Sequence, residues 1–101
     1  MKIEYTHKLQ PDDARARLCA FADYLQARYG LGVTWNGDSA KVTGKYMVVT
    51  IEGTLTMVGD KVSFEGTDPG FLWRNKARDY LLNKLQKYLD PATSVDRLPR
   101  A

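Results

Sequence analysis

The sequence has few of the side chains from which catalytic and metal sites are built. Its 101 residues include one cysteine and one histidine, so it cannot form an internal disulfide or a zinc site of clustered histidines and cysteines. A lone cysteine favours a reducing compartment, and we expect a cytoplasmic protein. The glycines match neither a phosphate-binding loop nor a dinucleotide-binding fingerprint.

Long apolar runs are also missing. The longest, Leu18 to Ala22, is far shorter than the ~20 residues of a transmembrane helix, and so is the run from Tyr46 to Val49. The first residues, Met1 to Glu4, contain no apolar stretch typical of a secretory signal. The net charge of +3 permits anionic partners, although strong nucleic-acid binders carry denser basic clusters.

The first third of the chain shows a strand pattern followed by a helix pattern. Residues 2–9 alternate between apolar and polar side chains, which is typical of a half-buried strand. Pro11 then opens an apolar stripe at helical spacing that continues to Tyr29, and Gly30 supplies a helix stop.

The middle of the chain predicts antiparallel hairpins. Asn36-Gly37 and Gly59-Asp60 are tight-turn signals, and residues 46–58 alternate most clearly. The inward side chains of this segment are Met47, Val49, Ile51, Leu55 and Met57. Gly53 interrupts this apolar face, so we expect a bulge, a bend or the close approach of a helix there.

A second helix is predicted to follow Asp68-Pro69, with Asp68 as its cap and Pro69 as its first residue. Pro91 ends it. The apolar arc of this helix comprises Trp73, Ala77, Leu81, Leu85, Tyr88 and Leu89. We expect a single domain over residues 1–91 and a flexible tail over residues 92–101, which have no periodicity.

This order of elements predicts an α+β fold, β-α-β-β-β(-β)-α, in which both helices cover one face of a curved antiparallel sheet. The other face, rich in threonine, lysine and glutamate, should meet water or a partner. A homodimer formed through that face or through an edge strand is one such alternative.

No pattern points to catalysis. His7 and Cys19 would have to meet to form a nucleophile–base pair, but no motif supports this. We expect His7 at the core margin and Cys19 as a small filler. Glu52 and Glu65 could be cross-strand neighbours, yet both fall on the solvated face, and the carboxylates lack calcium-loop spacing. We predict no enzyme, metal or cofactor.

The second helix carries the clearest candidate surface. An aromatic–lysine edge is formed by Trp73, Lys76, Tyr80, Lys84 and Lys87. Its rings could enter an amphipathic or anionic surface while the ammonium groups contact phosphates. Alternatively, the rings border the core and the lysine stems cover them.

Two arginines in the opening turns of this helix are a separate candidate. Arg74 and Arg78 are like charges one turn apart, where the helix dipole disfavours cations by ~0.3–1 kcal/mol each. An acidic neighbour such as Asp68 or Glu65 would relieve this, and a bound anion is the other hypothesis.

Several short motifs occur in a fixed order up to Pro91. They are His7-Lys8-Leu9, Tyr29-Gly30-Leu31, Trp35-x-Gly37-Asp38, Gly53-Thr54-Leu55, the Val62/Phe64 strand, Gly70-Phe71-Leu72 and Tyr88-Leu89-Asp90. In this order the chain resembles the small polyhydroxyalkanoic acid (PHA) system proteins, which are encoded among the genes of bacterial storage-polyester metabolism. The resemblance implies a bacterial cytoplasmic protein tied to PHA granules, and it supplies no catalytic residues.

The aromatic–lysine edge and the resemblance together predict a non-enzymatic binding module at the granule surface or on a granule protein. One alternative is a carrier of a small apolar, acyl ligand, held between two helices and a curved sheet with Gly53 at the centre of the cavity. Another is nucleic-acid binding through the basic helix, with an affinity that falls steeply with salt.

Overall fold

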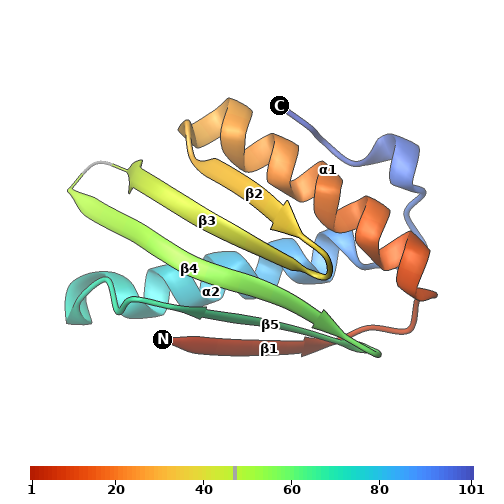
Figure 1. The fold of residues 1–101 in the computed structure, drawn as a ribbon, viewed down its shortest axis with the longest axis horizontal. Coiled ribbons are helices and arrows are strands. Elements are labelled where there is room, and N and C mark those ends of the chain that lie inside the picture. The colour runs from red at the N-terminus through yellow and green to blue at the C-terminus, as the bar shows by residue number, and fades with distance from the viewer. Residues whose placement is uncertain (47) are drawn as a thin grey trace.

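The computed structural model describes residues 1–46 and 48–101 (Figure 1). Its elements are β1 (Lys2–Thr6), α1 (Pro11–Tyr29), β2 (Gly32–Asn36), β3 (Ser39–Tyr46), β4 (Val49–Val58), β5 (Lys61–Gly66), α2 (Phe71–Tyr88) and the short 3-10 helix η1 (Val95–Arg97). The predicted α+β class and element order are confirmed. Met47, which the sequence places on the inward face, lies outside the described residues.

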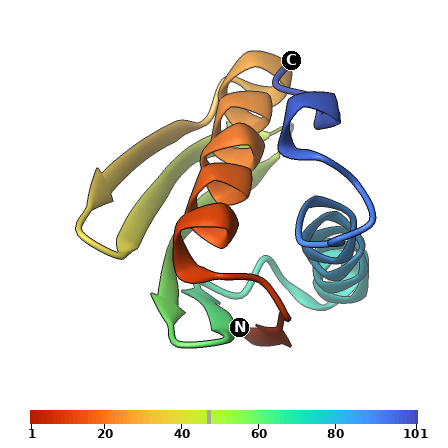
Figure 2. The same ribbon diagram turned by 90° about the vertical axis from the view of Figure 1, so that its right-hand side faces the viewer.

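The five strands form one sheet in the order β1-β5-β4-β3-β2, and every neighbouring pair is antiparallel. The strands that α1 connects, β1 and β2, are therefore the two edges of the sheet. Both helices lie on the same, concave side of the sheet (Figure 2). The threonine-, lysine- and glutamate-rich face is on the other side and is exposed, as the alternation predicts.

Helix α1 forms where the sequence predicts it. Pro11 is its first residue, acidic side chains occupy its first turn, and Gly30 closes it at a φ of 68°. This left-handed conformation is one that glycine adopts readily and other residues avoid. The stop signal is local, so it could be found without knowledge of the fold.

Gly53 is approached by an aromatic ring of the neighbouring strand. Gly53 pairs with Val42 of β3 and with Gly66 of β5, in register with the residues that follow it in β4. The expected bulge is therefore not present there. A Cβ atom at Gly53 would collide with the ring of Phe64 and lie 2.8 Å from the backbone oxygen of Glu65. The close contact expected from a helix is therefore made by Phe64, which lies over the Gly53–Gly66 pair.

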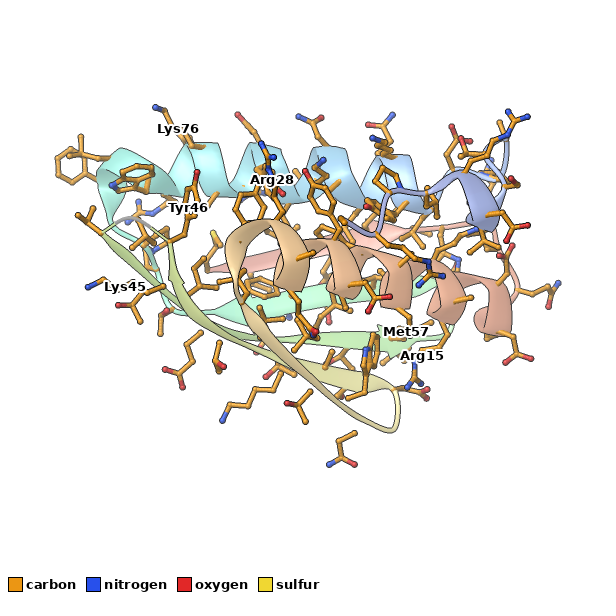
Figure 3. All side chains as sticks on the ribbon, turned by 90° about the horizontal axis from the view of Figure 1, so that it is seen from above. Arg15, Arg28, Lys45, Tyr46, Met57 and Lys76 are labelled. Atoms are coloured by element: carbon orange, nitrogen blue, oxygen red, sulfur yellow. The ribbon has the colours of Figure 1, made fainter. Side chains whose placement is uncertain are left out.

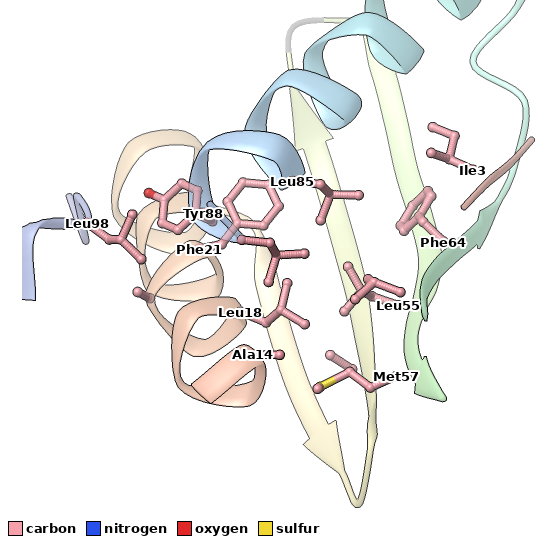
Figure 4. Close-up of a cluster of buried hydrophobic side chains, with 14 residues drawn as sticks. Ile3, Ala14, Leu18, Phe21, Leu55, Met57, Phe64, Leu85, Tyr88 and Leu98 are labelled. Atoms are coloured by element: carbon pink, nitrogen blue, oxygen red, sulfur yellow. The ribbon is translucent and has the colours of Figure 1, made fainter. Parts of the chain in front are cut away.

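The tightly packed core lies where the second half of α2 meets α1 and the sheet (Figure 4). Leu85, Tyr88 and Leu89 are buried there beside Leu18 and Phe21. The rings of Phe21 and Tyr88 are 5.0 Å apart between centroids. These contacts join the two helices directly.

A buried arginine connects the helices as well. Arg17 of α1 donates from Nη1 to the backbone oxygens of Tyr88, at 3.2 Å, and Asp90, at 2.7 Å. Its Nε donates to Oδ1 of Asp13 at 2.9 Å. A cation is favourable at the C-terminal carbonyl groups of a helix. Nothing in the sequence pattern predicts that a residue of α1 caps α2.

Helix α2 begins later than the sequence predicts. The prediction that Pro69 is its first residue was wrong, since Phe71 begins the helix and Gly70, with a φ of 98°, precedes it. Asp68 still organises this end, because its Oδ1 accepts a hydrogen bond of 2.9 Å from the Gly70 amide.

The segment after α2 packs along α1. Leu98 is buried in the core, the Tyr88 hydroxyl donates to the Pro99 backbone oxygen, and Arg100 forms an ion pair of 2.7 Å with Asp23. The sequence did not predict these contacts, because the segment has no periodicity. Its mobility, and the domain boundary at residue 91, stay predictions.

Candidate functional site

The two halves of α2 are buried to different degrees. Leu85 and Tyr88 in the second half, and Leu89 directly after it, are almost completely buried. Trp73, Ala77 and Leu81 of the same apolar arc are only partly buried. The arc itself is continuous. The first half of the helix therefore lacks neighbours that fill the space between it and the sheet.

A cavity of about 380 Å³ occupies this space. It lies between the second half of α1, the first half of α2 and the inner face of the sheet. Its floor includes Phe21, Leu55 and Phe64, and its opening includes Tyr46 and Lys76, which lie at one end of the molecule (Figure 3). This volume falls within the range of small-ligand sites, ~300–1,000 Å³.

The cavity is not centred where the sequence places it. Gly53 was expected to leave open space, but the ring of Phe64 lies over it. The space instead lies beneath the first half of α2, next to Ala77. A short side chain on the helix, rather than on the sheet, leaves this room.

Three tyrosines from three elements meet at one wall. The ring of Tyr29 in α1 stands edge-on to Tyr46 in β3, at 5.0 Å and 82° between planes, and to Tyr80 in α2, at 5.9 Å and 78°. Edge-to-face contacts of this kind are favourable. They connect the helices at the open end, where close aliphatic packing is missing.

The Tyr80 hydroxyl is a buried polar atom in this wall. It makes no hydrogen bond of standard geometry among the residues that the structure describes, and the Tyr29 side chain is its polar neighbour. Burial raises the pKa of Tyr80, so the hydroxyl stays protonated at neutral pH and can donate. Buried hydroxyls without a partner are uncommon in folded proteins.

The structure brings the aromatic–lysine edge together over this cavity. Trp73 and Tyr80 line it. Lys76 Nζ lies 5.8 Å from the Trp73 ring centroid, and Lys84 Nζ lies 4.6 Å and 5.6 Å from those of Tyr24 and Tyr80. Lys87 is exposed in the last turn. The rings thus border the interior with lysines over them, and contact of this edge with a partner stays a prediction.

The two arginines of the opening turns are placed differently. Arg74 pairs with Asp68 at 2.6 Å, so an acidic neighbour relieves its unfavourable position. The Arg74 guanidinium also lowers the pKa of the Asp68 carboxyl. Arg78 is exposed, and Glu65 pairs with Lys2 instead, at 3.4 Å. An anion at Arg74 and Arg78 stays a prediction.

An apolar tip, formed by Val48, Phe71 and Leu72, is a feature that the sequence reasoning missed. These side chains are 78%, 79% and 71% exposed. Val48 directly precedes β4, and the start of β4 and the start of α2 lie at the same end of the molecule in both views (Figures 1 and 3). The available signal was the run Phe71-Leu72-Trp73, because three consecutive helical residues cannot all face one core.

The potential catalytic residues do not assemble. His7 is buried, and its Nδ1 accepts a hydrogen bond of 3.1 Å from the Leu9 amide. Cys19 is partly buried on α1. Glu65 faces Thr54 across the sheet, not Glu52. In residues 1–46 and 48–101, no three histidine, cysteine, aspartate or glutamate residues are grouped as metal ligands.

The sequence matches the family model described as "Putative polyhydroxyalkanoic acid system protein" over residues 1–92. The chain belongs to this PHA system family. The match ends one residue after Pro91, which confirms the resemblance seen in the ordered motifs. The family name links the chain to the genes of the PHA system.

Searches of curated proteins and of solved structures found no match. Within the described residues of this PHA system protein, neither helix has the length and apolar character needed to span a bilayer. Its compartment stays a prediction.

Proposed function

We propose that this PHA system protein is a non-enzymatic accessory module that binds the surface of PHA granules through its apolar tip. The observation that carries the proposal is the exposure of Phe71 and Leu72, 79% and 71%, at the first turn of a helix. Large apolar side chains grouped in water mark interaction sites. The family supports a polyester surface as the partner.

The surroundings of the tip suit such a surface. Arg74, which pairs with Asp68, and Lys76 lie about one turn further along the same helix and are exposed, so cationic heads stand beside the apolar side chains. An arrangement of this kind lets apolar groups enter an interface while charged ends stay in water. The aromatic–lysine edge then continues along the helix behind the tip.

The test is co-sedimentation with protein-free PHA particles. We expect the wild-type protein to sediment with the particles. The double substitution Phe71→Ser/Leu72→Ser should weaken binding more than tenfold, since burying each side chain contributes ~1.5–3 kcal/mol. Val58→Ser is the matched control, because Val58 is 68% exposed and ends β4 at the opposite end of the molecule (Figure 1).

Two results would contradict the proposal: wild-type protein that stays in the supernatant, or a double variant that sediments as well as the control. Sedimentation with native granules but not with protein-free particles would assign a granule protein as the partner instead. Retention of DNA or RNA that falls steeply with salt would favour the nucleic-acid alternative. Release of soluble acids from the particles would contradict the non-enzymatic part.

A further inference from the structure

The cavity favours a ligand with an apolar body. Its walls are aliphatic and aromatic, and among the described lining residues only Lys76 and Glu52 carry charged side chains. Both residues are exposed. Glu52 belongs to the outward-facing set of β4, because Gly53 and Leu55 are the buried members of the alternation. Its carboxylate therefore points away from the cavity, and Lys76 supplies the charge at the opening.

Lys76 is available to an anionic group. Its Nζ stands over the Trp73 ring, 5.8 Å from the centroid, and no carboxylate of the described residues forms an ion pair with it. An ammonium group at the opening of an apolar cavity matches a ligand whose charged end is a carboxylate.

Tyr80 adds a second polar position in the wall of the site. It follows Lys76 by four residues, which corresponds to one helical turn and about 6 Å along the axis. Its hydroxyl is buried beside Tyr29 and makes no hydrogen bond of standard geometry among the described residues, so a ligand reaches it when the tyrosine wall shifts to admit the ligand. A ligand oxygen a few bonds away from the carboxylate would accept a hydrogen bond from it and remove the unsatisfied donor.

We propose that this cavity binds a medium-chain 3-hydroxyalkanoate. The alkyl chain lies in the cavity, the carboxylate lies beside Lys76, and the 3-hydroxyl oxygen accepts a hydrogen bond from Tyr80. The same chemistry is present in a free hydroxy acid and at the carboxyl end of a polyester chain. The site is distinct from the apolar tip, so this inference does not rest on granule docking.

The experiment compares 3-hydroxydecanoate with decanoate, both below their micelle-forming concentrations. Binding is measured by calorimetry and by the fluorescence of Trp35 and Trp73, which both line the cavity. We expect 3-hydroxydecanoate to bind about fivefold more tightly than decanoate, as one net hydrogen bond allows. A linear trimer that binds more tightly than the monomer would assign the polymer end, and the reverse order would assign the free acid.

Three substitutions separate the contributions of the Tyr80 hydroxyl, the Lys76 charge and the cavity volume to ligand binding. Tyr80→Phe should abolish the preference for the hydroxy acid and leave decanoate binding unchanged. Lys76→Met should weaken both acids to a similar extent. Ala77→Phe should fill the cavity and abolish binding of both. Val58→Ser serves as the control, and circular dichroism confirms that each variant folds.

The inference is overturned if the wild-type protein binds neither acid, or binds both equally. It is also overturned if Tyr80→Phe keeps the preference. Because Phe71→Ser/Leu72→Ser should leave acid binding intact and Ala77→Phe should leave particle sedimentation intact, failure of this inference and failure of granule docking are distinguishable.

Discussion

Leu81 and Leu85 are one turn apart on the same face of α2, yet only Leu85 is completely buried. The second half of the helix is enclosed by α1, the sheet and the C-terminal segment, whereas the first half covers a cavity. An apolar arc therefore shows which side of a helix faces inward. It does not show whether neighbours fill the space in front of it.

The two ends of α2 are also anchored differently. The C-terminal carbonyl groups accept hydrogen bonds from the buried Arg17, and Tyr88 packs against Phe21. The N-terminal end is anchored by the exposed pair of Arg74 and Asp68 and by edge contacts between tyrosines. Most of the stability should therefore come from one end, which leaves the other end available for binding.

The largest expected difference in stability is between the same substitution, leucine to alanine, at two positions of α2. Leu85→Ala should destabilise the fold by ~2–5 kcal/mol, because it opens a void in a packed region. Leu81→Ala should cost about 1 kcal/mol or less, a typical loss for a side chain that is only partly buried and borders space that already exists. Urea unfolding of both variants measures this. Equal losses would show that the two halves of α2 are packed alike.

Loss of the anchor at the packed end should come next. Arg17→Met keeps the aliphatic stem but leaves the carbonyl groups of Tyr88 and Asp90 without their donor. We expect a loss of about 2 kcal/mol, as for hydrogen bonds to a charged group. Arg28→Met is the control and should stay within ~0.5 kcal/mol, because Arg28 is exposed. If Arg17→Met loses no more stability than Arg28→Met, the hydrogen bonds of Arg17 do not anchor this end of α2.

The smallest effect concerns the anchor at the open end. Arg74 lowers the pKa of Asp68 in the folded state, so the carboxylate contributes stability above its unfolded pKa of ~3.9. This contribution is lost as the pH falls through the folded pKa. Asp68→Asn should therefore be less stable than wild type at neutral pH, and the difference should disappear in acid.

Thermal unfolding of both proteins between neutral and acidic pH measures this difference. In an Arg74→Gln background the same substitution should show a smaller dependence on pH, because the main partner of the carboxylate is gone. If the stability difference between wild type and Asp68→Asn grows on acidification, the Asp68 carboxylate does not stabilise this end of the helix.

The elements of this fold were predictable because their signals are local. Alternation indicates which strand residues face inward, and Gly30 ends α1 at the predicted residue. The start of α2 was misplaced because Asp68-Pro69 has the composition of a helix start, while the conformation of Gly70 delays it. The aromatic–lysine edge lies on α2 as its helical spacing predicts, and two of its rings, Trp73 and Tyr80, line a cavity.

By itself the sequence determined the α+β order, the inward faces, most of the turns and the membership in the PHA system family. Only the tertiary structure decided that Arg17 caps α2, that Leu98 joins the core, and that space remains beneath Ala77. These features depend on contacts between residues far apart in the chain. Periodicity fixes the direction of a side chain, whereas the distance to its neighbours is set by how complete elements pack.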